Sequence, residues 1–293
     1  MFWNLAINLI LSLFLARGDF APAVYSDAPL IALKPGAAAV ELAAEKGAVL
    51  SAQDHFFLFT KRADEVQPIA SITKLMTSLV FLDSNPGWEE IYEIKENDKV
   101  EGGRLNLFLG EKVKVKDLFY TSLVASDNGA TIALVHSTGL SEEEFVARMN
   151  AEAKRLGLVR TKFSDPVGLG DDNVSTAREV ALLAKAAFDR REIREATASR
   201  EYNFTTFTGV EKKVESTDYL LFDSEKNSFQ VLGGKTGYTD KAGYCFVSRL
   251  KDGNREVIAV VLNSVGKNER FKESKNLVNW VFNNYDWKKD KLF

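Results

Sequence analysis

The chain has 293 residues, of which 45% are hydrophobic and 27% are charged, and its net charge is −3. This composition is typical of a globular protein with one large domain, or with two subdomains that share a core. Acids and bases are interspersed, without the basic stripe that predicts nucleic-acid binding. One cysteine and two histidines exclude an internal disulfide and argue against a zinc site.

The first residues predict export. Residues 2–15 (FWNLAINLILSLFL) are mostly apolar. A run of about 14 suits the hydrophobic part of a secretory signal and is short for a membrane span of roughly 20 residues. Ala21-Pro22-Ala23 supplies small residues for cleavage, although no Lys or Arg precedes the run. We expect residues 1–23 to be a signal peptide or a retained N-terminal membrane anchor, with a buried helix as the alternative. The remaining chain, 24–293, then acts outside the cytoplasm.

The next segments predict a hairpin and a helix. Two short apolar runs, 48–50 and 56–60, are separated by a turn signal and read as paired strands. Pro68 precedes good helix formers, and the segment 84–87 (SNPG) contains strong helix breakers. We therefore expect a helix over about 71–83.

A helical block should follow. Residues 90–114 read as short strands and loops (IYEI, then LNLFLG), and a helical pattern extends from about 115 to 190. Ser141-x-x-Glu144 and Thr176-x-x-Glu179 are capping boxes, which mark the starts of helices. Between them, residues 163–173 (FSDPVGLGDDN) contain one proline and two glycines and predict an irregular loop.

The last third predicts strands and a final helix. Residues 231–237, 243–250 and 256–264 read as strands, the last two joined by the turn Lys251-Asp252-Gly253-Asn254. An amphipathic helix is expected at about 269–285. Strands at both ends of the chain predict an α+β fold: one antiparallel sheet flanked by helices, with an all-helical subdomain at about 88–195. Cys245 is expected as a buried strand residue.

Ser71 and Lys74 are the first candidate for chemistry. At a helix start, the free N–H groups favour a developing negative charge, and a lysine at i+3 lies on the same face. A neutral lysine amine can activate a serine as a nucleophile. A capping serine beside a solvated lysine would give the same pattern, which also occurs at Ser248–Lys251 and Ser264–Lys267.

A histidine-based serine hydrolase is a poor alternative. His136 lies inside a helical pattern, His55 lies at a hairpin edge, and no Gly-x-Ser-x-Gly elbow is present. If a serine is the nucleophile, a lysine must therefore be its base.

Two further motifs are weak individually. Ser126-Asp127-Asn128 interrupts an apolar helical stretch, and its hydroxyl and amide groups could relay a proton and hold a substrate amide; a polar loop between helices is the plain alternative. Lys235-Thr236-Gly237 ends a strand after Gly233-Gly234, and glycines in a strand indicate close approach to the backbone. A cation and a hydroxyl there suit the anionic end of a substrate. An ordinary strand end with an exposed lysine would give the same sequence pattern.

Taken together, the three motifs occur in the order found in penicillin-binding proteins and class A β-lactamases. The flanking segments AGYCFV, EGGRLNLFLGEKVKVKDL and FVARMNAEAKRLGLVRTKFSDPVGL resemble the D-alanyl-D-alanine carboxypeptidase/endopeptidase family. The resemblance covers roughly residues 30–287. Many members continue into a C-terminal β domain and an amphipathic anchor, and we expect neither here. The other two Ser-x-x-Lys copies lie outside the family pattern.

The resemblance implies a penicillin-sensitive serine carboxypeptidase that trims peptidoglycan stem peptides without a metal or organic cofactor. Its residues would have the following roles: Ser71 the acylated nucleophile, Lys74 its base, Ser126 a proton relay, Asn128 a holder of the substrate amide, Lys235 and Thr236 the carboxylate subsite beside Gly237, and the N–H groups of Ser71 and Tyr238 the oxyanion hole. Lys74 must then be neutral near pH 7, which we attribute to burial and to the charge of Lys235.

Three alternatives remain. An endopeptidase that cleaves peptide cross-links uses the same machinery and differs in what the groove admits beyond the scissile bond. A class A-like β-lactamase needs a carboxylate to activate water, usually a glutamate; the loop 163–173 has none, although Asp165, Asp171 and Asp172 are acidic. An inactive peptidoglycan-binding module would be expected to have lost a reactive residue, and all are present.

Overall fold

The computed structural model describes residues 31–100, 106–223 and 228–287. The expected signal or anchor at 1–23 lies outside these ranges. Among the described helices, none has both the length and the apolar character that crossing a bilayer requires.

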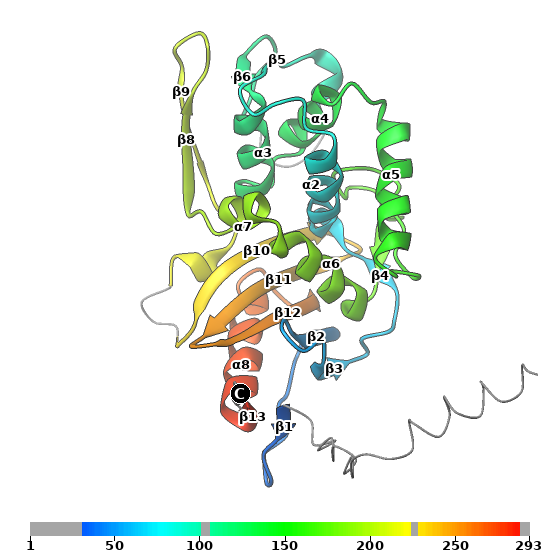
Figure 1. Ribbon diagram of the computed structural model, residues 1–293, viewed down its shortest axis with the longest axis vertical. Helices are drawn as coiled ribbons and strands as arrows, with labels where there is room; N and C mark the ends of the chain where they lie inside the picture. Colours follow the sequence, from blue (N-terminus) through cyan, green and yellow to red (C-terminus); the bar gives the residue numbers. More distant parts are fainter. Residues whose placement is uncertain (1–30, 101–105, 224–227, 288–293) are drawn as a thin grey trace, which may run out of the picture.

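A five-stranded antiparallel sheet unites the two ends of the chain (Figure 1). The N-terminal hairpin pairs with the last long strand, placing Ala48 opposite Val260. This sheet confirms the predicted α+β fold. Its strands, in spatial order, are β10 (Gln230–Thr239), β11 (Gly243–Asp252), β12 (Arg255–Ser264), β2 (Lys46–Ser51) and β3 (Phe57–Lys61).

Helices cover both faces of the sheet. Along β12, Val257, Ala259 and Val261 belong to one buried cluster, with α8 (Glu269–Asn284). The alternate residues Ile258, Val260 and Leu262 belong to the other, with α6 (Ala177–Asp189). Successive strand side chains point to opposite faces, so an unbroken apolar run is what a central strand covered on both sides requires.

The other helices form a block on the α6 side of the sheet (Figure 1). Two short strands between 90 and 114 are also present, the first of them as expected at IYEI, so this block is mainly, and not entirely, helical. The strand predicted at LNLFLG is misplaced: the described residues 106–110 form no strand, and the strand follows at β6. The elements are α2 (Lys74–Asp83), β5 (Ile91–Glu93), η2 (Glu96–Asp98), β6 (Lys112–Lys114), α3 (Val115–Val124), α4 (Asn128–Ser137), α5 (Glu142–Arg155) and α7 (Arg191–Thr197).

Several pairings were missing from the sequence prediction. The largest is a hairpin that stands beside α3 in Figure 1. The missed strands are β8 (Glu201–Thr205) with β9 (Glu211–Glu215), β1 (Ile31–Leu33) with β13 (Tyr285–Trp287), and β4 (Gln67–Pro68) with β7 (Val174–Ser175).

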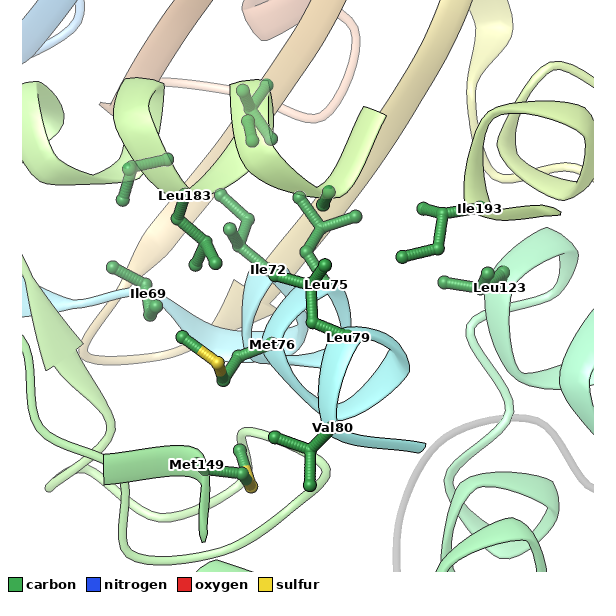
Figure 2. Packing of buried hydrophobic residues seen from close by; sticks show 14 of the residues in the cluster. Ile69, Ile72, Leu75, Met76, Leu79, Val80, Leu123, Met149, Leu183 and Ile193 are labelled. Atoms are coloured by element: carbon green, nitrogen blue, oxygen red, sulfur yellow. The ribbon is translucent and has the colours of Figure 1, made fainter. Parts of the chain in front are cut away.

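Helix α2 is the centre of the larger core. Figure 2 shows its apolar side chains between α6, represented by Leu183, α3, represented by Leu123, and α5, represented by Met149. Every residue from Lys74 to Phe81 is buried. Because α2 is enclosed on all sides, its first residue, Lys74, also lies inside the protein.

Candidate active site

Ser71 lies on the single turn η1 (Ala70–Thr73), directly before α2. The predicted helix over 71–83 is therefore confirmed, with its first turn of the 3-10 type. Ala70 has a positive φ of 49°, and the Ile69 N–H donates to the Asn173 carbonyl oxygen in the loop region. These constraints hold Ser71, which is partly exposed, at the wall of a cavity.

Lys74 contacts Ser71 from the buried side of the site. Its Nζ lies 3.0 Å from Ser71 Oγ, 2.7 Å from Asn128 Oδ1 and 2.8 Å from the Val167 carbonyl oxygen. Two of these neighbours are carbonyl oxygens, which only accept hydrogen bonds. In a neutral amine they take both N–H groups, so the lone pair is left for the hydroxyl of Ser71.

The environment of Lys74 favours that neutral form. Burial lowers the pKa of Lys74 to about 7, while the charges of Asp127 and Asp165 act in the opposite direction. Burial was the expected cause. The second expected cause, repulsion by Lys235, does not shift the pKa of Lys74. The repulsion acts on Lys235 instead, whose pKa is lowered by burial and then by the charge of Lys74. An amine with a pKa near neutrality is well matched to base catalysis.

Within the Ser126-Asp127-Asn128 motif, Asp127 stabilises the local fold, while Ser126 and Asn128 line the cavity. Asp127 caps α4 by accepting from the Ala130 N–H, and its other oxygen accepts from Asn106. Ser126 has a positive φ of 57°, a conformation that non-glycine residues rarely adopt. This bend brings its Oγ within 2.7 Å of Lys235 Nζ, which donates to it. An unusual backbone at such a position supports a functional role.

Strand β10 forms the opposite wall. Lys235 is buried, and Thr236 Oγ1 donates to Thr217 Oγ1 over 2.7 Å. A Cβ at Gly237 would lie 2.7 Å from the Ile69 carbonyl oxygen and 3.3 Å from the N atom of Ser71. Only glycine therefore lets the strand approach the Ser71 turn this closely.

Gly233 and Gly234 also allow other groups to lie close to the strand backbone, but those groups belong to this protein. A Cβ at Gly233 would meet Thr197 and Phe188, and one at Gly234 would overlap the carboxylate of Asp218. The sequence prediction of close approach is confirmed here, and the approaching groups are side chains of this chain.

A cavity of about 320 Å³ joins these walls. It brings together six of the eight predicted site residues, and Lys74 and Lys235 lie buried beneath it. Its lining residues are Ser71, Ala125, Ser126, Asn128, Leu169, Thr217, Tyr219, Thr236, Gly237, Tyr238, Lys267 and Arg270.

Two charged residues beside the cavity were not foreseen. Arg270 is buried, and its Nη1 donates to the carbonyl oxygens of Gly237 and Cys245 over 3.1 and 3.3 Å. Asp218 is buried too, and its Oδ2 has no hydrogen-bond partner among the described residues. Burial raises the pKa of Asp218 to about 7, and the charges of Arg270 and Lys235 oppose that rise.

The other two Ser-x-x-Lys copies form no comparable pair. Ser248 is buried in β11, and its hydroxyl has no partner among the described residues. Ser264 donates to Glu273, while Lys251 pairs with Glu256. Cys245 is buried in the same sheet, as predicted.

Comparison with known proteins is consistent with this geometry. A family model described as D-alanyl-D-alanine carboxypeptidase matches residues 34–266. A D-alanyl-D-alanine endopeptidase of Escherichia coli is 30% identical over 245 residues, 82% of this chain and 78% of the relative. A D-alanyl-D-alanine carboxypeptidase of Bacillus subtilis is 33% identical over 280 residues, 91% of this chain and 68% of the relative.

Solved structures agree in fold. The Streptomyces K15 DD-transpeptidase superposes with a TM-score of 0.77 at 27% identity, covering 84% of this chain and 99% of its own. Penicillin-binding protein D2 of Listeria monocytogenes, in its ampicillin-bound form, has a TM-score of 0.72 at 31% identity, with 84% and 99% covered.

Proposed function

This chain belongs to the D-alanyl-D-alanine carboxypeptidase family, and from that premise we propose that it cleaves the bond between two D-alanines of peptidoglycan stem peptides through an acyl-enzyme on Ser71. The observation that carries this proposal is the position of Lys74. Its Nζ lies 3.0 Å from Ser71 Oγ, and carbonyl oxygens of Asn128 and Val167 account for its two other contacts.

Acylation begins when Lys74 Nζ takes the hydroxyl proton of Ser71. Ser71 Oγ then forms a bond to the carbonyl carbon between the two D-alanines, and the carbonyl oxygen becomes an oxyanion. The N–H groups of Ser71 and Tyr238 stabilise that charge. The closeness of β10 to Ser71, which depends on Gly237, supports this assignment.

Release of the first product needs a proton on the leaving amine. Ser126 Oγ relays it, and the hydrogen bond from Lys235 Nζ orients this hydroxyl. Lys235 and Thr236 receive the terminal carboxylate of the substrate, while Asn128 orients its amide. Water then attacks the ester on Ser71, which frees the shortened peptide and restores the hydroxyl.

The β-lactamase alternative is supported less well. Asp165, the first acid of the loop 163–173, accepts hydrogen bonds from the N–H groups of Val167, Gly168 and Gly170. Asp171 pairs with Lys241 on the hairpin turn. Asp165 holds the loop in shape and Asp171 is paired with a cation, so neither is a good candidate for a base that activates water.

We extend the proposal to the organisation of the protein. Residues 24–293 form one catalytic domain with a mainly helical subdomain at about 88–195, and residues 1–23 direct it out of the cytoplasm. The substrate lies in the cell wall, which supports an extracytoplasmic place of action.

Labelling with fluorescent penicillin tests the proposal, because this drug acylates the nucleophile of such enzymes. We expect the wild type to be labelled and Ser71→Ala to remain dark. Ser248→Ala and Ser264→Ala are matched controls from the other Ser-x-x-Lys copies and should be labelled normally. Undiminished labelling of Ser71→Ala would remove this residue from the mechanism.

A further inference from the structure

A second cavity, of about 250 Å³, is lined by α3, α7 and the segment before β5, and it shares no lining residue with the cavity at Ser71. Helices α3 and α7 are neighbours in Figure 1. The walls are aromatic: Trp88 precedes β5, and Phe119 and Tyr120 lie on α3. The ring centroids of Trp88 and Phe119 are 5.2 Å apart, and Tyr120 stacks on Tyr202 of β8 at 4.3 Å. Because other rings support them, these walls are preorganised for a ligand.

The lining of this cavity is also acidic. Glu192 and Glu195 lie one turn apart on the same face of α7, and Glu89 comes from the segment before β5. Glu89 pairs with Lys114 and Glu195 pairs with Arg191, each over 2.6 Å. The carboxylate of Glu192 forms no ion pair or hydrogen bond with any residue that the structure describes. Its charge is therefore available to a ligand.

Lys116 shows that a cation can lie against this wall. It lines the cavity from α3, and its Nζ lies 5.9 Å from the centroid of the Tyr120 ring, within the range of a cation–π contact. Lys116 is exposed and forms no ion pair with a carboxylate in the described ranges. Its ammonium can leave the ring without breaking a salt bridge, so the cation of a ligand can replace it.

These features fit an alkylated ammonium group. A primary ammonium has three N–H donors to satisfy, and two of the three lining carboxylates are already paired. An ammonium whose hydrogens are replaced by methyl groups needs no acceptor. It needs ring faces, which attract its charge and cover its methyl groups, and a negative charge nearby.

We propose that this cavity binds a small organic cation with a trimethylammonium group, which lies against the rings of Trp88 and Tyr120 with Glu192 as its counter-ion. The volume suffices for choline, which has about seven non-hydrogen atoms, at about 30 Å³ for each group the size of a water molecule. The site is separate from the proposed active site, and binding involves no covalent step.

Ligand-detected NMR titration with choline tests the proposal. The matched neutral probe is the alcohol that carries a tert-butyl group in place of trimethylammonium. We expect choline to bind about tenfold more tightly than this alcohol, as a cation–π contact shielded from water predicts. Glu192→Gln should weaken choline binding about threefold, the effect of a partly exposed charge pair. Glu143→Gln, the same change in the first turn of α5, is the control and should have no effect.

Lys116 gives an independent arm with the opposite sign. Lys116→Ala removes the competing cation and should tighten choline binding, whereas a misfolded variant would only lose it. Equal binding of choline and the neutral alcohol would overturn the inference, and so would affinities that neither Glu192→Gln nor Lys116→Ala changes.

Vesicles of phosphatidylcholine identify the source of the cation. Binding of free choline without co-sedimentation with these vesicles is the expected result and supports a soluble ligand. Co-sedimentation that Glu192→Gln abolishes would also support the site, with a lipid head group as the occupant.

Discussion

At the scale of single residues, Lys74 combines features that a solvated lysine lacks. It is 0% exposed, begins a buried helix, and faces two carbonyl oxygens besides the hydroxyl of Ser71. Transfer out of water penalises the charged amine, which is why its pKa falls to about 7. The carbonyl oxygens then hold the neutral amine in the orientation that the proposed deprotonation of Ser71 requires.

This arrangement predicts a pH profile. With the neutral amine as the proposed base, acylation by penicillin should rise with pH through about 7 and level off above it. Lys74→Arg should lower the rate above pH 7 by a factor on the order of 10²–10⁴, since arginine stays protonated. Stopped-flow acylation from acid to alkaline pH measures both. A rate that is independent of pH, or a normal rate in the arginine variant, would assign the proton to another group.

Asp218 predicts a pH dependence of stability. Its pKa is raised from 3.8 to about 7 by burial. Between those values the folded protein retains a proton that the unfolded chain has lost, so this group makes the fold less stable as pH rises through that window. Asp218→Asn does not titrate, and its free energy of unfolding should fall less than that of the wild type from pH 5 to pH 8.

Urea unfolding at the two pH values provides the measurement. A larger fall in the asparagine variant would mean that the charged carboxylate is favourable at pH 8, as a counter-ion to Arg270 and Lys235, the two cations acting on it.

The candidate site was predictable where motifs carry the chemistry. Ser71, Ser126 and Lys235 lie in three short patterns whose order is informative. Thr217 and Arg270 were missed because no local pattern marks them: Thr217 is defined by its contact with Thr236, and Arg270 looks like a surface position of an amphipathic helix. Lys267, which also lines the cavity, belongs to one of the two Ser-x-x-Lys copies outside the family pattern.

At the scale of elements, the two capping boxes show how a local pattern can serve different partners. Ser141 and Glu144 cap each other's backbone, as predicted. Thr176 caps its helix in the expected way, but Glu179 turns to the preceding segment and accepts from the Arg160 N–H and the Thr161 hydroxyl. It thereby fixes the chain that enters the loop 163–173.

These two glutamates should therefore differ in energetic weight. Glu179→Ala removes a buried acceptor and leaves the donors of Arg160 and Thr161 unpaired, which should cost about 1–3 kcal/mol of unfolding free energy. Glu144→Ala, at an exposed capping box, is the matched control and should cost less than about 1 kcal/mol. Urea denaturation of the wild type and the two variants measures both losses. Equal losses would show that Glu179 is only a capping residue.

The missed elements have common physical causes. The strand expected at LNLFLG is replaced by a turn, in which the Glu111 N–H donates to the Phe108 carbonyl oxygen and Gly110 has a φ of 80°. The β8–β9 hairpin lacks a wide apolar face; of the ten residues in its strands, only Val214 is buried. Sequence patterns detect burial, so a mostly exposed hairpin gives little signal.

At the scale of the whole molecule, the sheet was predictable because long apolar strands at both ends of the chain need one another. The pairing of β2 with β12 was less so, since nothing local specifies which strands meet. The result is a helical block and a sheet that meet along one cleft, with Ser71 and Ser126 on one wall and Thr236 of β10 on the other.

That cleft should treat a peptide and a β-lactam differently. A departing D-alanine leaves room for water, whereas the leaving group of a β-lactam stays attached and occupies that space. We expect a penicillin adduct that lasts minutes or longer on an enzyme that turns over D-Ala-D-Ala peptides. Intact-mass spectrometry after a stoichiometric dose follows the adduct. Its loss within seconds, with many equivalents of drug hydrolysed, would favour the β-lactamase alternative.

The pairing of β12 with β2 also sets when activity can arise. Residues 48 and 260 become neighbours only after almost the whole chain is available, and such distant contacts make folding slow. Before that point Ser71 and Lys74 are already in the chain, but Lys235 has no sheet to hold it. A growing chain therefore carries its proposed nucleophile without a complete site, and the site is complete only when the last strands have joined the sheet.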